Sequence, residues 1–330
     1  MLALLVVLTQ SLAVDIHAHP SRFHRANVGR IEAEEIARYR RSGIDVVVCN
    51  ISTDTPYRGG YVTRDGRTIE NGMLRAEPGE SWAFTLDRLD RILQTSASGD
   101  ALLVRTPEEA LEAKRQGKLA LIAALEGADG LEGELQHLRE LARRGVSLVQ
   151  LVHFRANEIG HIQTWPYTPG GLTSFGKQVV SEANRLRMVI DLAHANPETI
   201  RDVLAVSSHP VIFSHTGAFS LKKLDRHLGD EEMRAIAEKG GVIGIWPNGD
   251  ALPKLADMLD HIDHVKKLVG VDHVGIGSDL RGMSKYTAGF GEEARFDAIA
   301  EGLAARGYSP GEVEKLMGEN FVRVWKEVTR

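Results

Sequence analysis

The sequence predicts an α/β protein in which eight parallel strands alternate with helices and close into a (β/α)8 TIM barrel. Three observations predict this fold. Eight short apolar runs bounded by turn residues recur along the chain, as buried strands do. Amphipathic stretches with helix signals separate these runs, and strand then helix, repeated eight times, is the pattern of this barrel. The chain has 330 residues, and the barrel needs about 250, so the length is sufficient.

The predicted elements follow one another in order. The strands occupy residues 11–16, 44–49, 119–125, 147–152, 188–192, 210–213, 241–245 and 273–276. One helix begins at Thr106, which forms a capping box with Glu109 and is followed by Pro107, a residue suited to the first helical position. Another helix is predicted over residues 131–144, where apolar residues recur at helical spacing.

We expect one domain over residues 11–330, because no linker, repeat or low-complexity tract divides the chain. The surplus length falls in an insertion at about residues 51–105 and in C-terminal helices. The alternative fold is an open doubly wound sheet, which shares the alternation of strand and helix. Its dinucleotide motif is missing, because Gly275 and Gly277 are not followed by a third glycine at the required spacing.

Residues 1–8 form an apolar run with no Lys or Arg ahead of it. A bilayer span needs roughly 20 apolar residues, so the run is too short to cross a membrane. A signal peptide cut after Ala13 would remove most of the strand that leads into Asp15 and His17. We therefore interpret residues 1–10 as an apolar N-terminal extension and expect a cytoplasmic protein.

The composition excludes two classes of site. The formal net charge is -5 and no basic block runs along the chain, so we expect no nucleic-acid partner. Cys49 is the single cysteine, which excludes an intrachain disulfide and a cysteine-based zinc cluster. Any metal must be held by the 13 histidines and 45 carboxylates.

Histidines and carboxylates follow six of the eight predicted strands. A barrel places its active site at the carboxyl ends of its strands, so these side chains are expected to converge. Alternation along the first strand directs His17 and His19 to the same side. The candidate site residues are His17, His19, Glu126, His153, His194, His215 and Asp279.

Imidazole and carboxylate ligands together suit Zn²⁺ or a similar divalent ion. Five or six ligands are too many for one such ion, so two metals that share a bridging carboxylate fit better, with a hydroxide between them as the nucleophile. Glu126 is the natural bridge, because its strand lies between the other ligand-bearing strands. Asp279, beside the first strand, is then placed to take a proton from the water and pass it to the leaving amine.

Several segments, in their order and spacing, resemble the membrane dipeptidase family (renal dipeptidase-like, metallopeptidase family M19) of the amidohydrolase superfamily. The likeness covers most of residues 12–328. The matching segments are residues 14–17, 125–127, 153, 171–176, 179–180, 184–186, 191–194, 211–215, 275–279 and 318–321. The resemblance implies a barrel and a zinc-dependent dipeptidase with two zinc ions per chain.

The resemblance also implies roles for single residues. It implies that His17, the second residue after it and Glu126 hold one zinc ion. Glu126, His194 and His215 would hold the other ion. The remaining matches concern the substrate and its protons: His153 and Arg226 match substrate-binding positions, and Asp279 matches the acid/base aspartate.

One position departs from the family. The family pattern at the first strand is His-x-Asp, whereas this chain has His17-Ala18-His19, as in other amidohydrolases. A neutral imidazole in place of a carboxylate leaves the site about one charge more positive, which changes metal affinity and water acidity. The departure puts the substrate preference in question more than the hydrolysis itself.

The sequence leaves three possible functions for this chain. The first is a dipeptidase in which Arg226 holds the substrate carboxylate by a bidentate pair. The second is another amidohydrolase, such as an N-acyl-amino-acid deacylase. The third is a non-catalytic metal-binding scaffold, which would need neither Glu126 as a bridge nor Asp279 as a proton carrier. The expected partner is a small-molecule substrate, with no transmembrane segment, and a homodimer is the candidate assembly.

Overall fold

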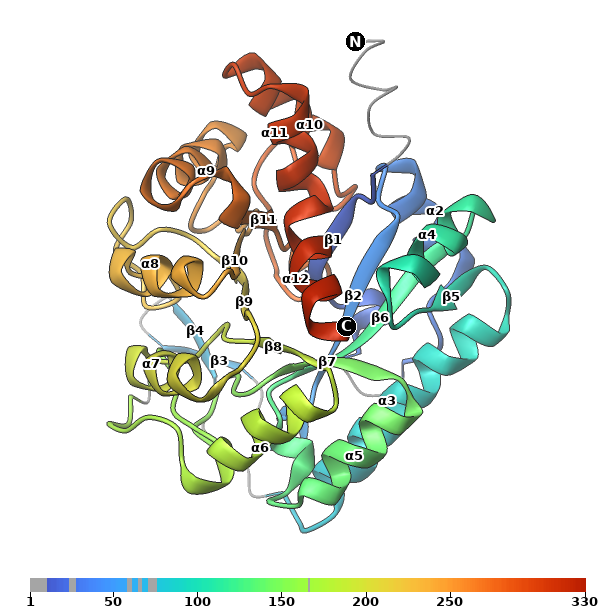
Figure 1. The fold of residues 1–330 in the computed structure, drawn as a ribbon, viewed down its shortest axis with the longest axis vertical. Coiled ribbons are helices and arrows are strands. Elements are labelled where there is room, and N and C mark those ends of the chain that lie inside the picture. Colours follow the sequence, from blue (N-terminus) through green and yellow to red (C-terminus); the bar gives the residue numbers. More distant parts are fainter. Residues whose placement is uncertain (1–10, 24–27, 58–60, 65–66, 71–75, 166) are drawn as a thin grey trace.

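Eight parallel strands form the barrel in the computed structural model, which describes residues 11–23, 28–57, 61–64, 67–70, 76–165 and 167–330 (Figure 1). Every predicted strand is present, so the predicted fold class is confirmed. The interpretation of residues 1–10 lies outside the described residues. The strands are β1 (Val14–Ala18), β2 (Val46–Ser52), β6 (Leu119–Glu126), β7 (Val146–Gln150), β8 (Val189–Asp191), β9 (Ile212–Thr216), β10 (Val242–Ile245) and β11 (Val274–Ile276).

The strands pair in chain order, and the ring is closed just beyond β11. Val46 pairs with Ala120 and, on the other side, with Val14, so β2 lies between β1 and β6. At the seam, a parallel bridge joins Ala18 to Leu280, and the backbone N–H of Asp279 donates to the His17 carbonyl at 2.8 Å. This closure brings the first and last strands into contact and places Asp279 beside His17.

Helices surround the barrel. They are α2 (Ala33–Arg41), α3 (Glu80–Ala97), α4 (Pro107–Arg115), α5 (Leu135–Arg144), α6 (Ser174–Arg185), α7 (Pro197–Val206), α8 (Asp230–Glu238), α9 (Leu255–Val269), α10 (Phe296–Ala305), α11 (Pro310–Glu314) and α12 (Asn320–Thr329). As predicted, Thr106 caps α4 by accepting from the Glu109 N–H at 3.3 Å, although the Glu109 carboxylate accepts from Arg105 and not from Thr106. The helix predicted over residues 131–144 begins only at Leu135.

The C-terminal helix covers the amino ends of the strands. Figure 1 shows α12 crossing the face of the barrel. Its apolar side packs in one buried cluster with residues that begin the strands, such as Val14, Val46 and Val242. Trp325 is 1% exposed, and its indole N–H donates to the Arg105 carbonyl at 3.0 Å. This end of the barrel is therefore closed by packing, and the opposite end carries the loops.

The insertion between β2 and β6 contains regular structure that the sequence did not predict. It holds a two-stranded hairpin, β3 (Tyr61–Arg64) with β4 (Arg67–Glu70), then α3 and a short strand β5 (Ala101–Leu103). Strand β5 pairs with the beginning of β6, outside the ring of eight. The alternation of strand and helix therefore continues through much of this segment.

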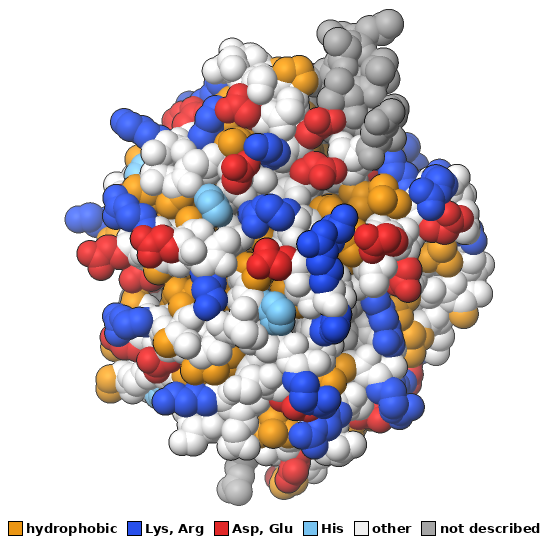
Figure 2. Space-filling model, viewed as in Figure 1, with side chains coloured by type: hydrophobic (Ala, Val, Ile, Leu, Met, Phe, Trp, Pro, Cys, Tyr) orange, Lys and Arg blue, Asp and Glu red, His pale blue; other side chains and the backbone are white. Residues whose placement is uncertain are grey.

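The face seen in Figure 2 has Lys and Arg side chains interspersed with Asp and Glu, and no single sign dominates it. Among the described helices, none combines the length and the apolar character needed to cross a bilayer.

Candidate metal centre

The loops and strand ends at the carboxyl side of the barrel bring all seven candidate residues of the strand ends together. His17 and His215 lie within their strands and Glu126 ends β6, while the other four follow β1, β7, β8 and β11 within three residues. All seven residues are buried, with at most 8% of their surface exposed. Six strands far apart in sequence therefore supply one buried group of imidazoles and carboxylates.

Glu126 lies at the centre of this group, and three histidines face its Oε1 atom. The Nε2 atom of His17 is 3.1 Å from Oε1, that of His194 is 3.8 Å away and that of His215 is 4.0 Å away. The Nε2 atoms of His194 and His215 are 3.2 Å from each other. Burial lowers the pKa of both rings well below the usual histidine value, so both are neutral.

The second oxygen of Glu126 faces a different set of side chains. His19 Nε2 is 3.3 Å from Oε2, and His153 Nε2 is 3.4 Å from it. The Ser52 hydroxyl donates to the same oxygen at 2.6 Å. Burial alone would raise the pKa of Glu126, but His153, His19 and His17 outweigh it and hold that pKa well below its usual value. Glu126 is therefore an anion with polar groups on both oxygens.

His19 connects Glu126 to Asp279. Its Nε2 atom is 3.3 Å from Asp279 Oδ1, the same distance as from Glu126. Burial disfavours the protonated ring, but these two carboxylates outweigh it and raise the pKa of His19 to about 10. The residue that departs from the family pattern thus points into the site and not away from it.

The donor set fits divalent cations. Ligand atoms lie within 4.8 Å of one another in three buried groups: His17, His19 and Asp279; His17, Glu126 and His215; and Glu126, His153 and His194. Imidazole nitrogens and ionised carboxylate oxygens that converge in one buried group are the ligands that Zn²⁺ prefers. Glu126 belongs to two of the three groups, as a bridging carboxylate would.

Arg226 follows β9 at the edge of this group. Its Nη2 donates to the His215 carbonyl at 3.4 Å, and its guanidinium lies 5.1 Å from the centre of the Trp246 ring. Burial lowers the pKa of Arg226 to about 10, although Asp279 and Glu126 oppose the change. The buried Nη1 atom has no hydrogen-bond partner among the described residues. Arg226 thus offers a charged donor to an anionic ligand.

Sequence reasoning missed several polar residues that contact the predicted ones. Asp54 Oδ1 accepts from His153 Nδ1 at 2.9 Å, and Asp54 is fully buried. The predicted second strand ended at Cys49, whereas β2 runs to Ser52, so Ser52 and Asp54 were assigned to the insertion. If the predicted second strand had been extended to Ser52, both residues would have been recognised as polar residues at a strand end.

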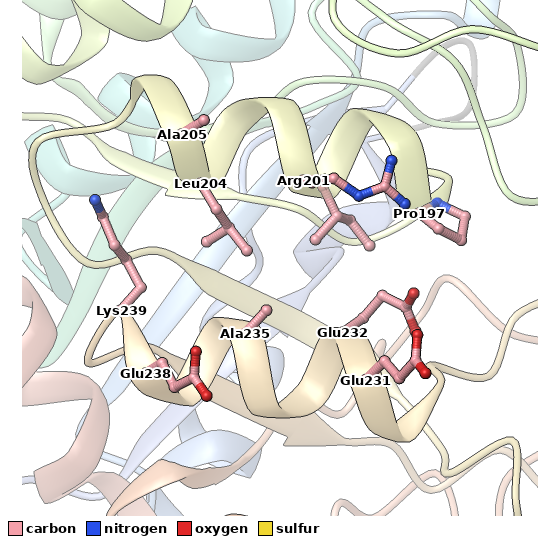
Figure 3. Close-up of a pocket in the computed structure, with 10 residues that line it drawn as sticks. Pro197, Arg201, Leu204, Ala205, Glu231, Glu232, Ala235, Glu238 and Lys239 are labelled. Carbon is pink, nitrogen blue, oxygen red and sulfur yellow. The ribbon is translucent and has the colours of Figure 1, made fainter.

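A groove on the outside of the barrel is separate from this centre. Figure 3 shows it between α7 and α8, with Leu204 and Ala235 between the helices and charged side chains such as Arg201 and Glu231 at its edges. None of the candidate site residues lines the groove. The groove is therefore not where the predicted chemistry takes place.

A family model described as membrane dipeptidase (peptidase family M19) matches residues 4–330. The chain belongs to this family. A curated relative, dipeptidase verJ of Clonostachys rogersoniana, is 32% identical over 276 residues, which cover 81% of this chain and 71% of that protein. Membership of this family of dipeptidases confirms the predicted class of reaction, the metal-dependent hydrolysis of a dipeptide.

Solved structures confirm the fold of this family member. The probable dipeptidase PvdM of Pseudomonas aeruginosa superposes with a TM-score of 0.82 at 20% identity, covering 99% of this chain and 98% of that one. A metallopeptidase of Rhodobacter sphaeroides, liganded with a phosphinate mimic of the dipeptide L-Ala-D-Ala, has a TM-score of 0.82 at 22% identity, over 96% of this chain and 99% of that one. The barrel is thus common to this chain and to both structures.

Proposed function

We propose that this member of the membrane dipeptidase family cleaves the amide bond of small free dipeptides with two zinc ions. The single observation that carries the proposal is the position of Glu126, whose two oxygens face histidines of different strands at 3.1 to 4.0 Å. A carboxylate in that position can bridge two cations. The two ions would acidify a water molecule and polarise the scissile carbonyl.

The proposed ligands form two sets that share Glu126. His17, His19 and Glu126 hold one ion, and Glu126, His194 and His215 hold the other. The 3.2 Å separation of the His194 and His215 Nε2 atoms supports their sharing an ion, because both rings are neutral and face the same oxygen. His17 Nε2 lies 3.1 Å from Oε1, which also faces this pair, and His19 Nε2 lies 3.3 Å from Oε2, so the first set contacts both oxygens of Glu126.

Asp279 is the proposed acid and base. Its carboxylate lies 3.3 Å from His19 and follows the last strand, beside the metal ligands of the first. From there it accepts a proton from the attacking water and returns it to the amine that leaves. A leaving amine must be protonated, so one carboxylate that serves both steps is sufficient.

Arg226 and His153 are proposed to bind the substrate. The unpartnered Nη1 atom of Arg226 supports recognition of the free carboxylate of a dipeptide. His153, oriented by Asp54, presents its Nε2 atom 3.4 Å from Glu126 and contacts the oxygen of the scissile carbonyl. A site that requires a carboxylate next to the scissile bond selects short substrates.

A panel of substrates tests the proposal. The zinc-loaded protein is assayed with free dipeptides, the same dipeptides amidated at the C-terminus, and N-acyl amino acids. We expect hydrolysis of the free dipeptides and strong loss on amidation, because the amide removes the charge that Arg226 recognises. Faster turnover of N-acyl amino acids would favour the deacylase instead, and no turnover of either class would favour the non-catalytic scaffold.

A variant checks the role of Arg226 within that panel. Arg226→Met should raise KM for free dipeptides and abolish the distinction between free and amidated substrates. Arg201→Met, on the outer groove, is the matched control and should change neither value. An unaltered preference for free dipeptides in Arg226→Met would contradict the assignment.

A further inference from the structure

We propose that Ser214 is a positioning residue that holds one ligand of each metal ion through a single hydroxyl group. The inference rests on the ligand set proposed above, in which His17 and His215 bind different ions. Ser214 lies in β9 directly before His215 and is completely buried. It was not among the residues that the sequence indicated.

The geometry places the hydroxyl oxygen between two imidazole rings. Ser214 Oγ is 3.0 Å from His17 Nδ1 and 2.9 Å from His215 Nδ1. Neighbouring residues of a regular strand point to opposite faces, but the pairing of β9 with β10 changes register between Phe213 and Thr216. Such an irregularity re-aims side chains, and here Ser214 and His215 serve one site.

Counting donors and acceptors assigns the direction of both hydrogen bonds. A histidine that binds a metal through Nε2 is neutral and carries its proton on Nδ1. His17 and His215 direct Nε2 toward Glu126, so each has an Nδ1–H to donate. A hydroxyl oxygen has two lone pairs and can accept both. The hydroxyl thus favours the tautomer that leaves Nε2 of both rings available to metal.

The remaining proton of the hydroxyl also has a candidate acceptor. Asp191 Oδ1 accepts from the backbone N–H groups of Ala193 and Ser214, each at 2.9 Å. Its Oδ2 atom is buried, lies 4.0 Å from His17 Nδ1, and has no hydrogen-bond partner among the described residues. The Ser214 side chain interacts with the Asp191 carboxylate, and an acceptor there would take the hydroxyl proton and leave both lone pairs for the rings.

The backbone of Ser214 is held rigidly by its neighbours. A Cβ atom at Gly244 of β10, or at Gly277 after β11, would lie 1.9 or 2.0 Å from the Ser214 carbonyl oxygen, so the backbone packs closer there than any side chain would allow. With the backbone held in this way, the two hydrogen bonds keep the hydroxyl between the rings. Its loss should weaken both metal sites together.

The experiment measures zinc affinity in Ser214→Ala by competition with a chromogenic chelator. We expect both dissociation constants to rise by about 10- to 100-fold, the usual effect of removing a partner of a metal-binding histidine. Ser147→Ala, the same change at a buried site in β7 away from the metals, is the matched control and should bind zinc as the wild type does. Ser214→Thr keeps the hydroxyl and should retain both affinities.

The outcomes separate this inference from the proposed ligand set. If the wild type binds fewer than two ions, the ligand set is wrong. If the wild type binds two ions and Ser214→Ala binds both with unchanged affinity, or loses affinity for only one, the shared role of Ser214 is wrong.

A measurement on the wild-type protein tests the proposal without depending on whether a variant folds. NMR of the zinc-loaded protein labelled with ¹⁵N in its histidine rings should show slowly exchanging Nδ1–H protons on both His17 and His215. A ring of either residue without that protected proton would overturn the proposal.

Discussion

Glu126 is the residue on which the proposed chemistry depends most. Its carboxylate contacts the rings of His17 and His19 on different oxygens, and it is ionised although it is buried. An anion at this position offsets the charge of two cations at once. A residue of the same shape without the charge should therefore fold and fail as a bridge.

Glu126→Gln should lose at least about 100-fold in kcat, because a neutral amide cannot bridge two cations and support the acidified water. Steady-state rates and metal content, measured on the same preparation, check this. Glu134→Gln, an exposed change beside α5, is the control. Near-normal turnover with two bound metals in Glu126→Gln would contradict the bridging role.

His19→Asp restores the family pattern and should make stability depend more strongly on metal. Without metal, the new carboxylate would face Glu126 and Asp279, which lie 3.3 Å from the present ring nitrogen, and repel both. With metal bound, the added charge becomes a ligand. The rise in thermal midpoint on adding zinc should exceed that of the wild type.

The control for this prediction is His209→Asp, which makes the same change between α7 and β9, outside the group of ligands. It should leave the response to zinc unchanged. Equal zinc-induced shifts in His19→Asp and in the wild type would show that His19 is not a ligand.

At the residue scale, the sequence predicted the side chains that follow strands but not the residues that orient them. His194 and Asp279 could be found because each comes within three residues of the end of an apolar run. Ser214 and Asp191 could not, because their importance depends on hydrogen bonds to residues of other strands. Ser214 directly follows the predicted strand at residues 210–213, but a serine there carries no local signal of such a contact.

At the scale of elements, helices α5 and α6 are linked by a carboxylate. Glu182 accepts from Arg139 of α5 at 2.6 Å and from Arg185 of its own helix at 2.7 Å. The hydrogen bond from Arg185, with that from Arg139, lowers the pKa of Glu182 to about 2. The ionised form therefore stabilises the packing of the two helices.

Glu182→Gln should lower the free energy of unfolding at pH 7 by about 0.5 to 1 kcal/mol, because both arginines are partly exposed and solvent screens the pairs. A carboxylate with a lowered pKa stabilises above its unfolded pKa, and that stability is lost as the pH falls through about 2. The difference between variant and wild type in urea unfolding should thus shrink below about pH 4.5.

Glu140→Gln provides the comparison, because its partner Arg143 is one turn away on the same exposed surface of α5. The effect of this substitution on the free energy of unfolding should be close to zero. If Glu182→Gln has the same small effect at all pH values, the link between α5 and α6 does not stabilise the fold.

The eight barrel strands were predictable because each is a buried apolar run, but element boundaries were less so. The helix predicted from residue 131 begins at Leu135, because residues 129–131 form a separate short turn before it. Strand β5 was missed because three residues are too few to show a pattern. The hairpin β3–β4 forms a sheet separate from the barrel strands, so the barrel pattern does not predict it.

At the scale of the whole molecule, the two ends of the barrel have different roles. The carboxyl ends of the strands and the loops that follow them carry the proposed metal ligands, whereas α12 closes the amino ends. The sequence predicted C-terminal helices only because the chain is longer than a barrel requires. The folded structure shows that α12 covers the amino ends of the strands. A change in α12 should therefore reduce stability without altering the chemistry.

Trp325→Ala should lower the free energy of unfolding by about 3 to 5 kcal/mol, because it removes a fully buried side chain and leaves a cavity. The kcat of the folded fraction at low temperature should be retained, since the site lies at the other end of the strands. Lys326→Ala, exposed on the same helix, is the control. A selective loss of zinc affinity in Trp325→Ala would contradict this division between the two ends.

Titration of the metal-free protein with zinc, with dipeptide hydrolysis as the readout, tests the central claim most directly. Two ions bridged by Glu126 predict that activity rises to its maximum at two zinc equivalents per chain and that bound zinc saturates at the same value. Full activity at one equivalent, or two bound ions without hydrolysis of any free dipeptide, would contradict the binuclear dipeptidase.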